Sequence, residues 1–123
     1  MKYEYYNPVD EKKSCIYRAI SKSVNRDYNL VKKEIDTLKD KLNTDDSVLV
    51  FETYLKQYNY IIDYTNKDRL ITEVMYNGNN IVFCYDKDWY HMICIIDNIL
   101  YDKYDLDKLS NLKIIKIYKK VNE

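Results

Sequence analysis

The chain has 123 residues, of which 46% are hydrophobic and 33% are charged. This length favours one domain with one core, and this composition excludes an intrinsically disordered chain. Twenty Lys and Arg residues balance twenty Asp and Glu residues, so there is no net positive field to gather phosphates, and nucleic acid is not expected as a partner.

Neither the start of the chain nor its apolar stretches suggest a membrane or secretory role. The segment MKYEYYNPVD contains no apolar run, and no stretch approaches the roughly 20 apolar residues that span a bilayer. The three cysteines, Cys15, Cys84 and Cys94, are an odd number at irregular spacing, which does not suggest a disulfide framework. We therefore expect free thiols, no membrane partner and a cytoplasmic location.

Fifteen tyrosines accompany a single glycine and a single proline. With the many Lys, Asn, Ile and Asp residues, this is typical of a very A+T-rich genome. Tyrosine rings could also stack on nucleic-acid bases, but such proteins place a basic groove beside the rings, and the charges here are balanced and interspersed.

The first half of the chain carries helical periodicity. After an N-terminal arm, apolar residues recur at helical spacing in the segments 14–25, 28–42 and 47–59, with Ser14 as the expected N-cap of the first. Residues 60–64 form a short β-prone run. The segment 69–76 predicts a short helix that ends in a turn at 77–80.

The pattern changes to β-branched and aromatic runs from residue 81 onward. These runs are IVFCY, WYHMICII, ILY and LKIIKIY, and Asp97-Asn98 predicts a tight hairpin turn. Helices first and strands second predict an α+β fold in one domain of residues 1–123, with N-terminal helices packed on a C-terminal antiparallel β-sheet.

Cys15 falls in the first turn of the first predicted helix. Free backbone N–H groups and the positive end of the helix favour a thiolate there, which suits a nucleophile. The alternative is structural, because a lone cysteine on a helix is more often a small buried hydrophobe.

His91 is the only histidine, and its ordinary pKa suits general-base work near neutral pH. The alternative is a structural histidine held by hydrogen bonds. Alternation along the predicted strand 89–96 places His91 and Cys94 on opposite faces. Since no CxxC or HxxxH spacing is present, we expect no metal site and no cofactor.

A thiol–imidazole pair needs a third group that orients the ring. Asp102 follows the hairpin turn and ends the partner strand, where it could lie beside His91. Asp97 and Asp105 are weaker candidates, because Asp97 fits a turn and Asp105 lies in an acidic loop.

Two islands of sequence resemble a known family. KSCIYRAIS and HMICIIDNILYD are similar to the DCxxRAxS and HxxxxIDGxxYDTWD motifs of small papain-like proteins of phages and prophages of Gram-positive bacteria. Both islands occur in the right order, with a helical segment between them. The departures are Ser14 for Asp, Asn98 for Gly, and Lys103-Tyr104 for Thr-Trp.

The resemblance implies a papain-like fold in which Cys15, His91 and Asp102 are the catalytic group. It makes Arg18 a family position without an assigned chemical role. Papain has a Gln oxyanion donor six residues before its Cys, where this chain has Val9. Asn7 is a possible substitute, beside the backbone N–H of Cys15.

The expected function is a cysteine hydrolase (peptidase, isopeptidase or amidase) that acts through a thiolate and an acyl-enzyme. The alternative is a weakly active or inactive papain-like binding module, of viral or prophage origin, that engages a host protein. The partner would be a protein or peptide, met in the host cytoplasm if a phage encodes the chain. Substrate specificity is expected from Tyr-rich loops and from residues 63–80.

Overall fold

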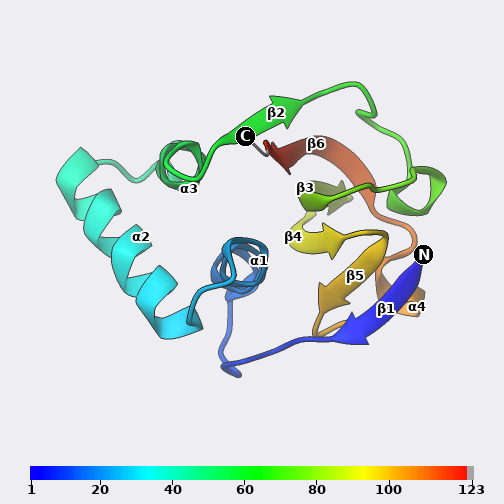
Figure 1. Ribbon diagram of the computed structural model, residues 1–123, viewed down its shortest axis with the longest axis horizontal. Helices are drawn as coiled ribbons and strands as arrows, with labels where there is room; N and C mark the ends of the chain where they lie inside the picture. Colours follow the sequence, from blue (N-terminus) through cyan, green and yellow to red (C-terminus); the bar gives the residue numbers. More distant parts are fainter. Residues whose placement is uncertain (122–123) are drawn as a thin grey trace.

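The structure is a computed structural model that describes residues 1–121 of the chain. Its elements in chain order are β1 (Lys2–Tyr5), α1 (Cys15–Val24), α2 (Tyr28–Leu42), α3 (Ser47–Lys56), β2 (Tyr60–Asp63), the 3-10 helix η1 (Ile71–Glu73), β3 (Asn79–Asp86), β4 (Trp89–Ile96), β5 (Ile99–Asp102), α4 (Leu106–Leu109) and β6 (Lys113–Lys120). Helices and a six-stranded sheet confirm the α+β class (Figure 1).

The three predicted N-terminal helices are confirmed, and local chemistry sets their ends. The carboxylates of Asp27 and Asp46 accept backbone N–H groups at the starts of α2 and α3, as N-caps do. Left-handed asparagines, Asn25 and Asn43, end α1 and α2. Ser14 is the N-cap residue of α1, as predicted, and its carbonyl oxygen accepts the N–H of Arg18, but its side chain makes no cap hydrogen bond.

The sheet has the strand order β1-β5-β4-β3-β6-β2. Every neighbouring pair is antiparallel except β1 and β5, which run parallel. The expectation of a purely antiparallel sheet is therefore corrected to a mixed sheet. The parallel strand is the segment expected as an N-terminal arm, and it takes the edge next to β5.

The predicted helix at 69–76 shortens to the three residues of η1. The backbone of this segment pairs with the start of β6 instead. The N–H of Ile71 donates to Leu112, the N–H of Ile114 donates to Arg69, and Leu70 forms a β-bridge with Lys113. These bonds use the polar groups that a longer helix would need.

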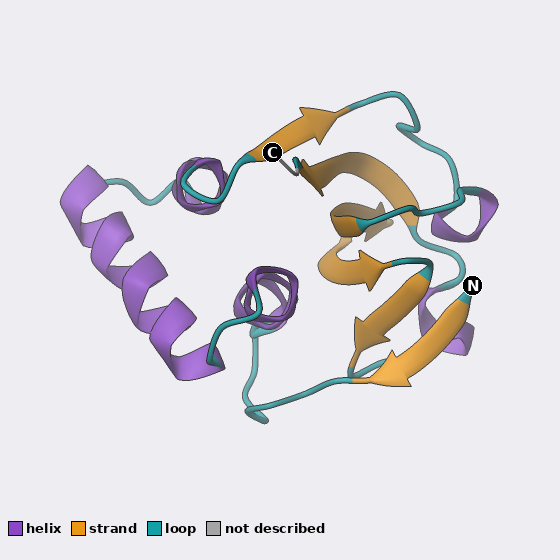
Figure 2. Ribbon diagram, in the orientation of Figure 1, coloured by secondary structure: helices purple, strands orange, loops and turns teal. Residues whose placement is uncertain are grey.

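Helices α1, α2 and α3 lie on one side of the sheet, and η1 and α4 lie on the other (Figures 1 and 2). Each face of the sheet has its own buried cluster. Along β4, Met92 and Cys94 face the helices while Ile93 and Ile95 face the second cluster, as the predicted alternation requires. Burial of these apolar side chains is the main stabilising contribution.

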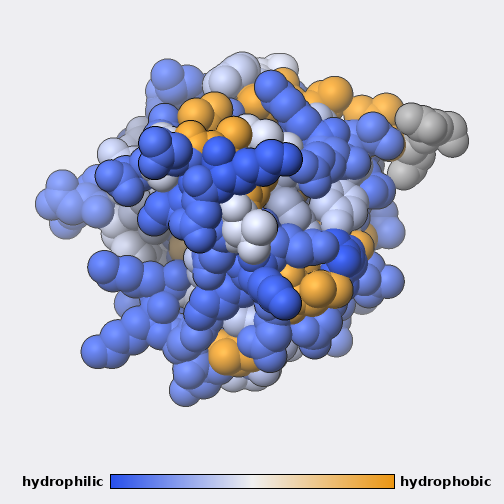
Figure 3. Space-filling model, turned by 90° about the vertical axis from the view of Figure 1, so that its left-hand side faces the viewer, coloured by the Kyte–Doolittle hydropathy of each residue, from blue (hydrophilic) through white to orange (hydrophobic). Residues whose placement is uncertain are grey.

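The outer surface around α2 is mostly hydrophilic, with small and separate hydrophobic areas (Figure 3). This agrees with α2, where only Tyr28, Val31 and Ile35 are buried. Among residues 1–121, no helix combines the length and the apolar character needed to cross a bilayer.

Candidate active site

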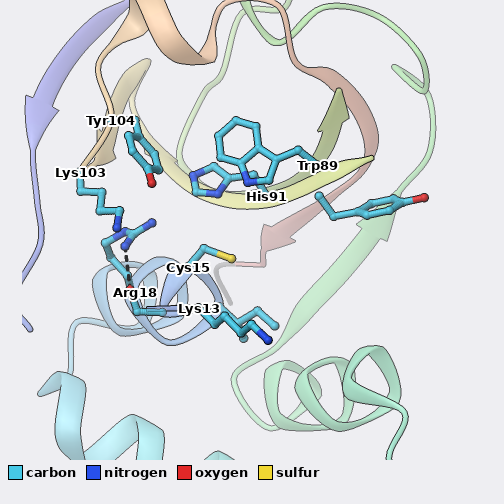
Figure 4. Close-up of a pocket in the computed structure, with 10 residues that line it drawn as sticks. Lys13, Cys15, Arg18, Trp89, His91, Lys103 and Tyr104 are labelled. Atoms are coloured by element: carbon cyan, nitrogen blue, oxygen red, sulfur yellow. Dashed lines mark hydrogen bonds between the residues drawn. The ribbon is translucent and has the colours of Figure 1, made fainter. Parts of the chain in front are cut away.

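Cys15 is the first residue of α1, and α1 packs against β4. The helix begins after a turn in which Lys13 has a positive φ of 55°. The thiol is half-buried and lies in a cleft beneath the rings of His91 and Trp89 (Figure 4). It therefore meets the requirement of a partly exposed thiol at a helix start.

His91 lies in β4 and is 3% exposed. Its Nε2 is 3.0 Å from Oδ2 of Asp102. An ionised carboxylate only accepts hydrogen bonds, so Nε2 carries the proton in this contact. Trp89 stacks on the ring with centroids 4.7 Å apart, and Tyr104 packs beside it at 5.8 Å. The remaining nitrogen, Nδ1, is free to bond the thiol of Cys15.

Asp102 is 1% exposed and has hydrogen-bond donors on both carboxylate oxygens. Oδ1 accepts from Nε of Arg18 at 3.1 Å and lies 3.0 Å from its Nη2. Oδ2 accepts from His91 and from the backbone N–H of Tyr104. The carboxylate thus joins a fully buried guanidinium to the imidazole, and its geometry is fixed on both sides.

Arg18 is 1% exposed and lies one turn into α1. Its Nη1 donates to the hydroxyl of Ser14 at 3.0 Å, the bond drawn in Figure 4. Ser14 therefore satisfies a buried guanidinium N–H instead of the helix backbone. The two residues attach the start of α1 to Asp102 and so place Cys15 relative to His91.

The hairpin between β4 and β5 brings Asp102 beside His91. Asp97 and Asn98 both have positive φ, 49° and 64°, which is the pattern of a two-residue type I′ turn. The register pairs Cys94 with Tyr101, so the next pair along the strands sets Asp102 on the face of His91. Asp102 is the last residue of β5, and the two residues that follow it, Lys103 and Tyr104, line the cleft.

The pKa values of Cys15 and His91 shift in opposite directions. Burial would raise the pKa of the Cys15 thiol, but the hydrogen bond and charge of His91, with the backbone N–H of Met92, lower it overall. Burial would lower the pKa of His91, but hydrogen bonds to Asp102 and to Cys15 raise it overall. Opposite shifts favour a thiolate–imidazolium pair.

The other two cysteines have the reverse environment. Cys84 and Cys94 are both fully buried. Burial raises the pKa of Cys84 well above its ordinary value and that of Cys94 to about 12. They remain neutral thiols at physiological pH.

The other candidate residues lie away from the pair. The Nδ2 of Asn7 is 3.4 Å from Asp10, and Asn7 does not line the cleft at Cys15. Asp97 accepts the backbone N–H of Gly78 in the turn, and Asp105 caps α4. The structure thus brings Cys15, His91 and Asp102 together and leaves Asn7 out. Residues 63–80, expected to set specificity, do not line the cleft either.

Trp89 and Tyr104, the aromatic partners of the histidine, were not expected from the sequence. Trp89 precedes His91 by two residues and so shares its face of β4. Strand alternation could therefore have predicted this contact from the sequence. Tyr104 becomes a neighbour only because the chain turns after β5. The cleft also includes Lys13 and Lys103.

Within residues 1–121, no group of three or more His, Cys, Asp or Glu side chains is arranged to hold a metal ion. In comparisons with known proteins, no protein-family model, no curated protein and no solved structure matches the chain. A function is therefore inferred from the geometry of the site.

Proposed function

We propose that the protein is a cysteine hydrolase of the papain-like kind that cleaves peptide, isopeptide or other amide bonds. The observation that carries the proposal is the arrangement at His91. One ring nitrogen is bonded to the buried Asp102 and the other is left for the half-buried thiol of Cys15. Nucleophile, base and orienting group are the three parts that such chemistry needs.

The reaction begins when the Cys15 thiolate attacks the carbonyl carbon of the substrate. A C–S bond forms and the carbonyl π electrons move to oxygen, where the free backbone N–H groups at the start of α1 can stabilise the charge. The imidazolium of His91 then gives its proton to the leaving nitrogen, and the C–N bond breaks. A thioester and a free amine result.

Hydrolysis of the thioester completes the cycle. His91 takes a proton from water, the hydroxide attacks the acyl carbon, and the C–S bond breaks to return the thiolate. Asp102 holds the ring in one orientation during both steps. Arg18 acts through Asp102 and is therefore a positioning residue.

The test is the rate at which iodoacetamide alkylates each cysteine as a function of pH. Cys15 should react far faster than Cys84 and Cys94, with a midpoint below the usual thiol pKa of about 8.5, because its thiolate persists at lower pH. A His91→Ala variant should move that midpoint upward. Equal labelling of the three cysteines in the native protein would contradict the proposal.

A binding module is the second candidate, and the position of Asn7 away from the cleft favours it. Without a side-chain donor at the developing oxyanion, acyl transfer would lose roughly a hundredfold or more in rate. Mixing the protein with an activated acyl ester separates the two functions. A hydrolase gives a burst and a thioester on Cys15, whereas a binding module gives neither.

A further inference from the structure

Two hollows meet at the Cys15–His91 pair. One has a volume of about 340 Å³ and the other about 640 Å³, and both are lined by Cys15, Ile16, Tyr90 and His91. A substrate carbonyl at the thiol therefore has room on two sides. The two sides differ in chemistry.

The larger hollow is apolar. Beyond the shared residues it is lined by Ser47, Val48, Phe51, Phe83, Met92 and Ile115. It contains no Lys, Arg, Asp or Glu, and Val48, Phe83 and Ile115 are half-buried. This volume and lining suit a large aliphatic or aromatic group, which would gain free energy by leaving water.

The smaller hollow is cationic. Its lining includes Lys13 and Lys103 and no carboxylate. Neither lysine forms an ion pair within residues 1–121, whereas the charge of Arg18 is paired with Asp102. The Nζ of Lys103 lies 5.0 Å from the centre of the Tyr104 ring, so a cation–π contact holds its ammonium against another residue that lines the hollow.

A third lysine lies nearby but does not line the hollow. Lys108 lies 5.5 Å from the centre of the Trp89 ring and 5.3 Å from that of Tyr104. The acidic residues near it, Asp88, Asp105 and Asp107, are exposed and do not line the hollow either. The unpaired charges that line the hollow, Lys13 and Lys103, are therefore both positive although the whole chain has a net charge of zero.

We propose that the substrate carries a large apolar group on one side of the reacting carbonyl and an acidic group on the other. A peptide with an apolar residue next to Asp or Glu has this chemistry. The proposal rests on Cys15 being the nucleophile of the proposed hydrolase. It adds a charge preference that the proposed reaction does not itself require.

The first test compares iodoacetate with iodoacetamide, which differ by one negative charge. The sulfur of Cys15 displaces iodide from either reagent, and the rate ratio is compared with that of a small free thiol. We expect Cys15 to favour iodoacetate about fivefold more than the free thiol does, since one exposed and one half-buried lysine, Lys13 and Lys103, each contribute modestly. The preference should shrink at high salt.

Variants assign the preference to the two lysines. Lys13→Gln with Lys103→Gln should abolish it, and Lys103→Glu should make the ratio favour iodoacetamide. Lys67→Gln is the matched control, because Lys67 is exposed and lies outside the hollow. Its ratio should equal that of the unmodified protein.

The second test is cleavage of quenched peptides with one apolar–acidic junction, in both residue orders. One of the two orders should be cleaved at least fivefold faster than its matched peptide with Asn or Gln in place of the acid. Replacing Phe83 by Ala should slow the cleavage of that peptide. It should leave unchanged the cleavage rate of a peptide in which Ala replaces the apolar residue.

The outcomes separate the two proposals. If Cys15 is selectively alkylated but shows no charge preference in either test, the substrate inference is overturned and the hydrolase proposal stands. If Cys15 is no more reactive than Cys84 and Cys94, both are overturned.

Discussion

At the scale of single residues, His91 has a polar partner for each ring nitrogen. Nε2 bonds Asp102, which leaves Nδ1 for Cys15, and the interaction with Cys15 is one of the causes that raise the pKa of the ring. Burial disfavours the charged ring, but these partners favour it and the pKa of His91 rises. This raised pKa sets the pH range over which the thiolate of Cys15 has a protonated His91 beside it.

The prediction for His91 is a titration midpoint above its ordinary pKa of about 6.5. Because the chain has one histidine, one imidazole proton resonance in an NMR titration reports it. Cys15→Ala should lower the midpoint, since the negative thiolate is lost. A midpoint below 6.5 in the unmodified protein would contradict the assignment.

The same shift makes stability depend on pH. A folded pKa above the unfolded value means that protonated His91 stabilises the fold at pH below the unfolded pKa. That contribution is lost as pH rises through the folded pKa. The Cys15 thiol acts in the opposite sense, because its pKa is lowered in the folded protein. Its thiolate stabilises the fold at pH above the unfolded pKa, and that contribution is lost as pH falls through the folded pKa.

The sequence predicted Cys15, His91 and Asp102 because each has a local signal. A helix start, a strand with a lone histidine and a two-residue turn followed by an acid can all be recognised from short segments. The role of Arg18 had no such signal. Its partner Asp102 is 84 positions away in the chain, and only the packing of α1 beside the end of β5 brings them together.

At the scale of elements, the Arg18–Asp102 pair joins α1 to β5. Both side chains are 1% exposed, so a lost partner leaves a charge in a low-dielectric interior. Arg18→Met should lower the free energy of unfolding by about 3 kcal/mol, measured by urea denaturation. Lys32→Met is the control, since its pair with Glu11 is about one third exposed and is screened by water, so its loss should change the free energy of unfolding far less.

The two results of this comparison have distinct meanings. Equal losses in the two variants would show that the buried pair adds nothing special to the α1–β5 contact. A large loss in Arg18→Met that shrinks when Asp102→Leu is added would show that the unpaired carboxylate is the cause.

The parallel strand β1 lay beyond what local patterns can predict. It has four residues, largely exposed at the edge of the sheet, so it lacks a buried alternating face. Its pairing depends on contacts with β5. The hydroxyl of Tyr3 and the backbone N–H of Tyr6 both donate to the carbonyl oxygen of Asp102. These bonds are long-range, and they support the residue that orients His91.

At the scale of the whole molecule, a chain with one glycine must still turn sharply many times. Non-glycine residues take left-handed φ values at these places: Lys13, Asn25, Asn43, Asn59, Asp68, Lys87, Asp97 and Asn98. Asn and Asp tolerate this conformation best, so a composition rich in Asn and Asp can replace glycine in turns. Composition alone could not predict which positions these would be.

Lys87 is the least suited of these residues in a hairpin. It and Asp88 connect β3 to β4, whose flanking residues Asp86 and Trp89 are paired. The φ of Lys87 is 53°, and a positive φ at the first of two loop residues alone is typical of a type II′ turn, which prefers glycine there. Lys87→Gly should therefore raise the free energy of unfolding by roughly 0.5–1 kcal/mol.

Lys67→Gly is the matched control for this hairpin change, because Lys67 is an exposed turn residue without a positive φ. There the added freedom of the unfolded chain should dominate, and stability should fall by roughly 0.5–1 kcal/mol. Thermal and urea unfolding of both variants measure whether the free energy of unfolding rises for Lys87→Gly and falls for Lys67→Gly. If Lys87→Gly destabilised the protein as much as Lys67→Gly does, the left-handed conformation at the hairpin would cost the native chain nothing. Lys87→Gly removes a side chain in the hairpin and adds no contact to β4. The reactivity of Cys15 should therefore remain unchanged while stability rises.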